Sequence, residues 1–114
     1  MNTEQFDKVV SNRLDAIKST LISKAKEYAK GDEDRLHNFN RASKVSGKRR
    51  EECLWGMAMK HLISVMDIID AMSKDESYIP SKELTSEKLG DLGNYLILLE
   101  ACIEDSRNNQ LLKK

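Results

Sequence analysis

The sequence contains few residues that break helices and few that could form disulfides. Of its 114 residues, one is proline, five are glycine, two are cysteine and 5% are aromatic. Clusters of β-branched and aromatic residues bounded by turn residues, which are typical of strands, are missing. Long uninterrupted stretches favour helices, and the length is that of one domain. The sequence therefore predicts a single all-α domain over residues 1–106, followed by a polar tail over 107–114.

The sequence also has no excess of positive or negative charge and no long apolar run. Nineteen Lys and Arg residues balance nineteen Asp and Glu residues, so no net field attracts nucleic acid. No apolar run approaches the ~20 residues that span a bilayer, and the N-terminal segment MNTEQFDK does not have the pattern of a signal peptide. Cys53 and Cys102 lie far apart in apolar patterns, which predicts two buried thiols. We therefore expect a cytoplasmic protein that binds neither DNA nor membrane.

Apolar residues recur at three- and four-residue steps, as amphipathic helices require. This pattern predicts long helices at 3–29, 50–72 and 82–105 and a short helix at 35–45. The first helix can be capped by Thr3 and ended by Gly31. At roughly 40 Å it is too long for a self-contained bundle of this size, which favours homo-oligomerisation. The second is apolar around most of its circumference and is expected to be central and buried. The basic stretch 46–50 is expected to be a solvated loop.

The second long helix carries a polar stripe. Lys60, Ser64 and Asp67 fall at i, i+4 and i+7, with His61 adjacent, so they share one side of the helix. Charges buried without partners are very costly, so these groups must reach solvent or meet partners. The simpler alternative is the solvated edge of an amphipathic helix, with His61 bound to a neighbouring carbonyl.

The third long helix has a matching stripe. Glu87, Asp91 and Asn94 again fall at i, i+4 and i+7. Two carboxylates one turn apart repel each other unless a cation lies between them, and Mg²⁺ prefers oxygen ligands of this kind. Gly90 and Gly93 flank Asp91, and this suggests the close approach of a backbone or a ligand. The alternative is an exposed acidic face.

A third polar cluster follows the first helix. Its acids, guanidinium, imidazole and amide are suited to phosphate and base contacts. The cluster consists of Glu27, Asp34, Arg35, His37 and Asn38. A fold that brought all three clusters together would make one site of them.

Several runs resemble a known family. The segments 26–28, 34–39, 54–57, 60–67 and 87–96 resemble small all-α proteins found mainly in bacteriophages and prophages, which are related by pattern to the MazG-like nucleotide pyrophosphohydrolases. The resemblance spans about residues 6–103. It implies a dimer or tetramer in which acidic residues of two helices hold Mg²⁺ on a nucleoside triphosphate while water attacks.

The residues match only one of the two acidic motifs of MazG-like enzymes. By resemblance, Glu87 and Asp91 stand where the second motif would be, at i, i+4 instead of i, i+3. The first motif has no counterpart, because Glu51 and Glu52 lie too early in the chain. This departure favours an alternative in which the protein binds a nucleotide, to sequester or sense it, without turnover. A further alternative is a helical phage protein that binds a host protein.

The preferred hypothesis is a Mg²⁺-dependent nucleoside triphosphate pyrophosphohydrolase in the cytoplasm of the host cell, with its polar pocket between the second and third long helices. Its expected catalytic residues are Lys60, His61, Asp67, Glu87 and Asp91, with Glu87 and Asp91 as metal ligands. The expected nucleotide-binding residues are Glu27, Asp34, Arg35, His37, Asn38, Ser64, Asn94 and Tyr95. The nucleotide hypotheses require the polar stripes of the two long helices to face each other.

Overall fold

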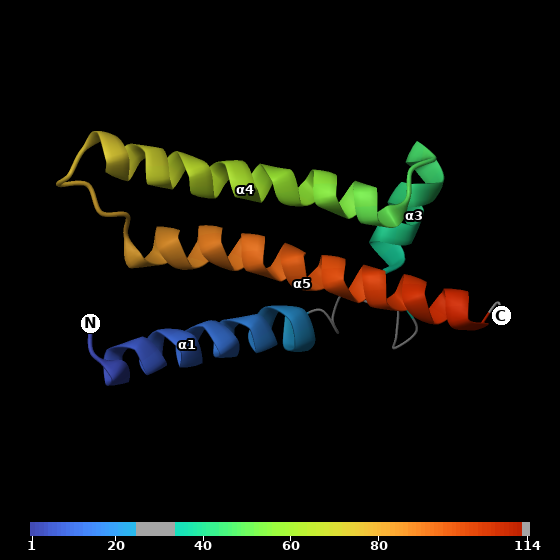
Figure 1. Cartoon of the computed structure of the whole chain (residues 1–114), viewed down its shortest axis with the longest axis horizontal. Coiled ribbons are helices and arrows are strands. Elements are labelled where there is room, and N and C mark those ends of the chain that lie inside the picture. Colours follow the sequence, from blue (N-terminus) through green and yellow to red (C-terminus); the bar gives the residue numbers. More distant parts are fainter. Residues whose placement is uncertain (25–33, 113–114) are drawn as a thin grey trace. The chain divides into compact units, whose positions relative to one another are not determined.

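The computed structural model describes residues 1–24 and 34–112. It divides into two compact units, Met1–Arg35 and Leu36–Lys114. The described residues are helical apart from short connections, and they contain no strand. This confirms the all-α prediction for the described part of the chain (Figure 1). None of the described helices is long and apolar enough to cross a membrane.

The first unit contains α1 (Thr3–Lys18), followed by a π-helical turn, η1 (Ser19–Lys24). Asn2, and not Thr3, caps α1: its side chain accepts a hydrogen bond from the Gln5 amide at 2.8 Å, and the Gln5 side chain accepts one from the Asn2 amide at 2.9 Å. The predicted helix 3–29 is therefore described as far as Lys24, and the predicted stop at Gly31 lies outside the described residues. None of the residues of α1 is buried.

The second unit contains α3 (His37–Ser46), α4 (Arg50–Lys74) and α5 (Lys82–Leu112). Helix α3 ends at Gly47, whose φ of 73° lies in the left-handed region that glycine tolerates best. Helices α4 and α5 lie side by side and antiparallel, and α3 crosses one end of the pair (Figure 1). We call the pair of α4 and α5 the hairpin.

The loop between α4 and α5 is closed by short-range hydrogen bonds. The Asp75 carboxylate accepts from the Ser77 amide at 3.0 Å, and the Ser81 hydroxyl accepts from the Leu84 amide at 3.0 Å. The second bond is an N-cap, so α5 begins one residue after Ser81, as the sequence predicts. The predicted end at residue 105 is wrong, because α5 continues to Leu112. No proline or glycine follows Gly93 to stop the helix.

The buried core of the second unit is small. It consists of Phe39 from α3, Leu54 and Ala58 from α4 and Cys102 from α5, and the large side chains of Leu54 and Cys102 are fully buried. Burial of Cys102 is as predicted, whereas Cys53 is only half-buried, and both thiols are free. Two residues of α4, Leu54 and Ala58, are buried. Contact with α3 and α5 alone therefore does not bury α4 to the extent that the sequence predicts.

Candidate functional site

His61, which lies beside the polar stripe of α4, contacts the polar stripe of α5. The Nδ1 atom of His61 lies 3.8 Å from the Oδ2 atom of Asp91. The imidazole also stacks on the ring of Tyr95, with 4.7 Å between ring centroids and 28° between planes. The side chain of His61 is 24% exposed and that of Asp91 is 41% exposed, so both remain accessible from solvent. The fold thus brings together three of the predicted site residues from two helices.

Asn94 lies one residue before Tyr95 and has a buried side-chain oxygen. Its Oδ1 atom is shielded from solvent and has no hydrogen-bond partner among the described residues. An unpaired buried polar atom typically costs 1–3 kcal/mol, so proteins rarely tolerate one without a reason. We define His61, Asp91, Asn94 and Tyr95 as the His61 cluster.

The rest of the α4 stripe lies on the same side of the hairpin as the His61 cluster but does not join its contacts. Lys60 and Asp67 are exposed, and their side chains make no hydrogen bond or ion pair with another described residue. The Ser64 hydroxyl donates to the Lys60 carbonyl at 3.2 Å, within its own helix. Each helix position turns by about 100°, which places Lys60 and Asp67 roughly 100–120° around α4 from His61. They flank the cluster from outside.

The predicted metal ligands do not form a closed centre. Glu87 is 62% exposed at its side chain and its Oε1 atom lies 3.8 Å from Nζ of Lys88. Across the described parts of the chain, no group of three or more His, Cys, Asp or Glu side chains could hold a metal ion. Gly90 is buried, whereas a Cβ atom at Gly93 would meet nothing within 4 Å. The suggested close approach is therefore not seen at Gly93 in the described structure.

The third predicted cluster is divided between the two units. Glu27 lies outside the described residues. Asp34 and Arg35 belong to the first unit, where the Arg35 guanidinium donates to the Leu21 carbonyl at 2.6 Å. His37 and Asn38 open α3, which packs around Leu54, whereas His61 is two turns further along α4, about 10 Å away. Within the second unit, the contacts join residues of the α4 and α5 clusters.

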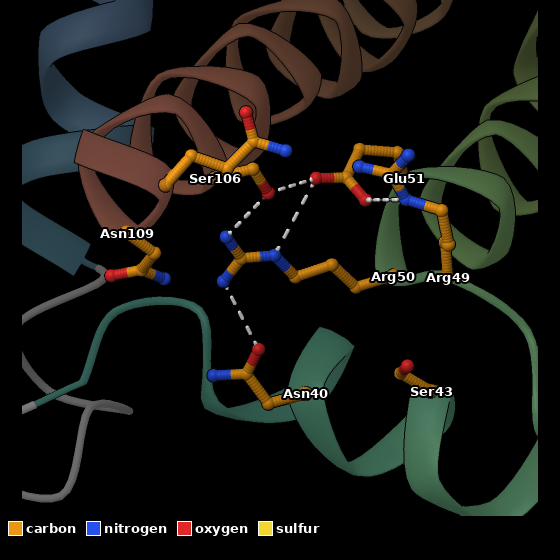
Figure 2. A pocket seen from close by; sticks show the side chains of 8 residues that line it. Asn40, Ser43, Arg49, Arg50, Glu51, Ser106 and Asn109 are labelled. Atoms are coloured by element: carbon orange, nitrogen blue, oxygen red, sulfur yellow. Dashed lines mark hydrogen bonds and ion pairs between the residues drawn. The ribbon is translucent and has the colours of Figure 1, made fainter. Parts of the chain in front are cut away.

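A second polar centre, around Arg50, was not predicted. Figure 2 shows the Arg50 side chain reaching from α4 between Asn40 of α3 and Ser106 of α5. Its guanidinium donates to the Asn40 side chain at 3.1 Å, the Cys102 carbonyl at 3.2 Å and the Ser106 hydroxyl at 2.9 Å. An ion pair of 2.7 Å joins it to Asp105. With only 12% of its side chain exposed, Arg50 clamps three helices and is not the solvated loop residue expected from the basic stretch 46–50.

Charge and burial act together at this centre. Burial alone would lower the pKa of Arg50, but the hydrogen bond and charge of Asp105 raise it above its ordinary value. Burial would raise the pKa of Glu51, but the Ser106 hydroxyl, the backbone amide of Glu51 itself and the charges of Arg49 and Arg50 lower it. Both groups therefore stay ionised at neutral pH, as a structural ion pair requires.

An open polar hollow of about 390 Å³ lies beside the Arg50 centre (Figure 2). It is lined by Asn40, Ser43, Arg49, Arg50, Glu51, Ser106, Asn109 and Gln110. Each terminal nitrogen of Arg50 already faces two acceptors, so the guanidinium has no donor left for a ligand. In the sequence, only the acidic and hydroxyl residues Glu51, Asp105 and Ser106 could have indicated a polar centre around Arg50. They form no motif, because they lie on two different helices.

Comparison with known proteins adds no family to this picture. No protein-family model, curated protein or solved structure matches the chain.

Proposed function

We propose that this protein binds a nucleotide at the His61 cluster and hydrolyses it as a Mg²⁺-dependent nucleoside triphosphate pyrophosphohydrolase of the MazG-like type, in the cytoplasm. One observation carries the proposal: His61, beside the polar stripe of α4, lies 3.8 Å from Asp91 of the α5 stripe and stacks on Tyr95. Had the stripes pointed to opposite sides of the hairpin, no single ligand could have touched both.

The arrangement of His61 and Asp91 suits general base catalysis. A carboxylate close to an imidazole can hold the ring in the orientation that proton uptake requires. In the proposed reaction, the oxygen of a water molecule bonds to the α-phosphorus while His61 takes up the proton. The bond from the α-phosphorus to the bridging oxygen breaks, and pyrophosphate leaves with that oxygen. Lys60, exposed beside His61, supplies positive charge for the phosphates.

Glu87 and Asp91 are the proposed ligands of Mg²⁺. They stand one turn apart on α5, and their side chains are 62% and 41% exposed. Mg²⁺ usually binds one or two carboxylates together with water and the phosphates of a substrate. Glu87 and Asp91 would supply these two carboxylates. Bound Mg²⁺ would neutralise phosphate charge.

Binding without turnover is a second candidate. The lack of a three-ligand acidic group within the described residues favours it, because a hydrolase commonly holds its metal more firmly. The same cluster would then sequester or sense a nucleotide. Both candidates use His61, Asp91 and Tyr95, so a single experiment can separate them from each other and from a protein that binds no nucleotide.

That experiment is calorimetric titration of the full chain with a panel of nucleoside triphosphates, with and without Mg²⁺, followed by product analysis. We expect Mg²⁺-dependent binding that Asp91→Asn weakens at least about tenfold, equivalent to about 1.4 kcal/mol. The matched control is Asp70→Asn, which removes an exposed carboxylate of α4 outside the cluster and should leave affinity unchanged.

The products decide between the two candidates. Release of pyrophosphate and a nucleoside monophosphate supports the hydrolase. Binding with the triphosphate recovered intact supports sequestration or sensing. Absence of binding by the wild-type protein across the panel, or equal weakening by Asp91→Asn and Asp70→Asn, would refute both and leave the host-protein hypothesis.

A further inference from the structure

Basic residues gather on α3 and on the turn that follows it. Residues 36–50 contain five Arg and Lys residues and neither Asp nor Glu. One of the five, Arg50, is held by Glu51 and Asp105 at the helix junction. The other four are exposed, and they are Arg41, Lys44, Lys48 and Arg49. We call these four residues the basic face.

Most of the charge on the basic face is uncompensated. The side chains of Arg41, Lys44 and Lys48 make no hydrogen bond or ion pair with another described residue. Arg49 is 72% exposed and lies 3.6 Å from Glu51. A surface contact of that length contributes little, so the charge of Arg49 also remains available to a partner.

The zero net charge of the chain conceals a separation of charge. Residues 67–91, around the loop between α4 and α5, contain seven acidic and three basic residues. The basic face belongs to the other end of the hairpin, where α3 crosses it (Figure 1). The first unit, Met1–Arg35, has seven basic and seven acidic residues, so it carries no net charge with which to neutralise the basic face. The argument from net charge against nucleic-acid binding therefore does not hold at this end.

The packing of α3 holds the basic face in place. Phe39 is buried in the core of the second unit. Arg41 follows two positions later, roughly 160° around α3, so the two side chains leave opposite sides of the helix. In the turn, the Ser43 hydroxyl donates to the Lys48 carbonyl at 2.6 Å, and the Ser46 hydroxyl accepts from the Lys48 amide at 3.2 Å. Cations on such a fixed scaffold lose less conformational freedom on binding than those of a flexible tail.

The outward side of α3 also carries side chains of the kinds that read base edges. Asn38, Arg41 and Val45 lie within roughly 60° of one another around the helix, and Val45 is 88% exposed. In the major groove of DNA, asparagine pairs with adenine, arginine pairs with guanine, and apolar side chains contact the methyl group of thymine. With 10 residues, α3 is about 15 Å long, and the major groove, ~12 Å wide, admits a helix.

We propose that α3 and the basic face bind duplex DNA, with α3 along the major groove and the four cations on the phosphates beside it. Charge complementarity favours a polyphosphate, and a helix with base-reading side chains favours a duplex of the B form. The major groove of duplex RNA is too deep and narrow to be read, and a membrane surface would require more than one apolar side chain on this face. This proposal goes beyond nucleotide binding and does not depend on it, because it uses no residue of the His61 cluster.

Fluorescence anisotropy tests the proposal, with a labelled DNA duplex of about 20 base pairs titrated with the full chain at several NaCl concentrations. Contacts to four phosphates predict a slope of about −3.6 for the logarithm of the binding constant against that of the salt concentration, at ~0.9 per phosphate. The double variant Arg41→Gln/Lys44→Gln removes two of the four contacts and should halve the slope. The matched control is Lys82→Gln, which removes an exposed lysine at the other end of the hairpin and should change neither slope nor affinity.

Both side chains replaced in the double variant are exposed, so it should keep the helical circular dichroism of the wild type. Absence of binding by the wild type at about 20 mM NaCl, where electrostatic binding is strong, would overturn the proposal, whether or not the chain binds vesicles of anionic phospholipid. Equal slopes for the double variant and the wild type would also overturn it, because other residues would then hold the DNA. So would an equal affinity for duplex RNA of the same length, because the groove would then not be recognised.

Discussion

Replacing Arg50 by methionine is the most direct test of how the second unit is held together. Methionine keeps most of the apolar stem and removes the guanidinium. The change deletes the hydrogen bonds to Asn40, the Cys102 carbonyl and Ser106, and the 2.7 Å ion pair with Asp105. These contacts join α3, α4 and α5, so their loss should destabilise the whole unit.

The expected cost follows from burial. Removing one partner of a buried ion pair typically costs 3–5 kcal/mol, because the other charge is left without compensation. Asp105 is 46% exposed and regains some hydration, which shifts the value towards the lower limit. The Cys102 carbonyl lies on a buried residue and loses a donor, which works against that shift. We therefore expect a loss of about 3 kcal/mol, a large part of the 5–15 kcal/mol typical of a domain.

Urea unfolding followed by circular dichroism at 222 nm, at one protein concentration, measures this loss. The control is Arg49→Met, which removes a 72% exposed side chain with a single 3.6 Å ion pair to Glu51 and should cost less than about 1 kcal/mol. Arg50→Lys keeps the charge without the planar fork and should fall between the two. Equal losses for Arg49→Met and Arg50→Met would refute the clamp.

Two further predictions concern titration and thiol chemistry. The pKa of Glu51 is lowered on folding from an ordinary value near 4.5, so its contribution to stability is present above about pH 4.5 and is lost as pH falls through the folded value. Glu51→Gln should therefore be less stable than wild type at pH 7, with the difference in unfolding free energy shrinking below about pH 4.5; a constant difference would contradict this. Burial raises the pKa of Cys102, so Ellman's reagent should react with Cys53 first and with Cys102 only after denaturant is added; two equally fast thiols would contradict the packing.

The helices of this protein are readily predicted because their signals are local. Ser81 supplies an N-cap at the expected place, Gly47 stops α3, and apolar spacing marks α4. Errors occur where the local signal is weak. Two adjacent residues can cap the first helix, and the C-terminal segment is polar but contains no residue that breaks a helix. The polar composition of residues 107–114 therefore suggested a tail, whereas α5 continues to Leu112.

The tertiary contacts were less predictable. The sequence placed His61 beside a polar stripe on one helix and Asp91 in a stripe on the next, and the packing of α4 on α5 brings these two side chains to 3.8 Å. The role of Arg50 could not be predicted in this way, because its partners Asn40 and Ser106 lie on two other helices and neither forms a repeating pattern. An arginine in a basic run is usually solvated, and only the antiparallel register of α4 and α5 brings Ser106 to it.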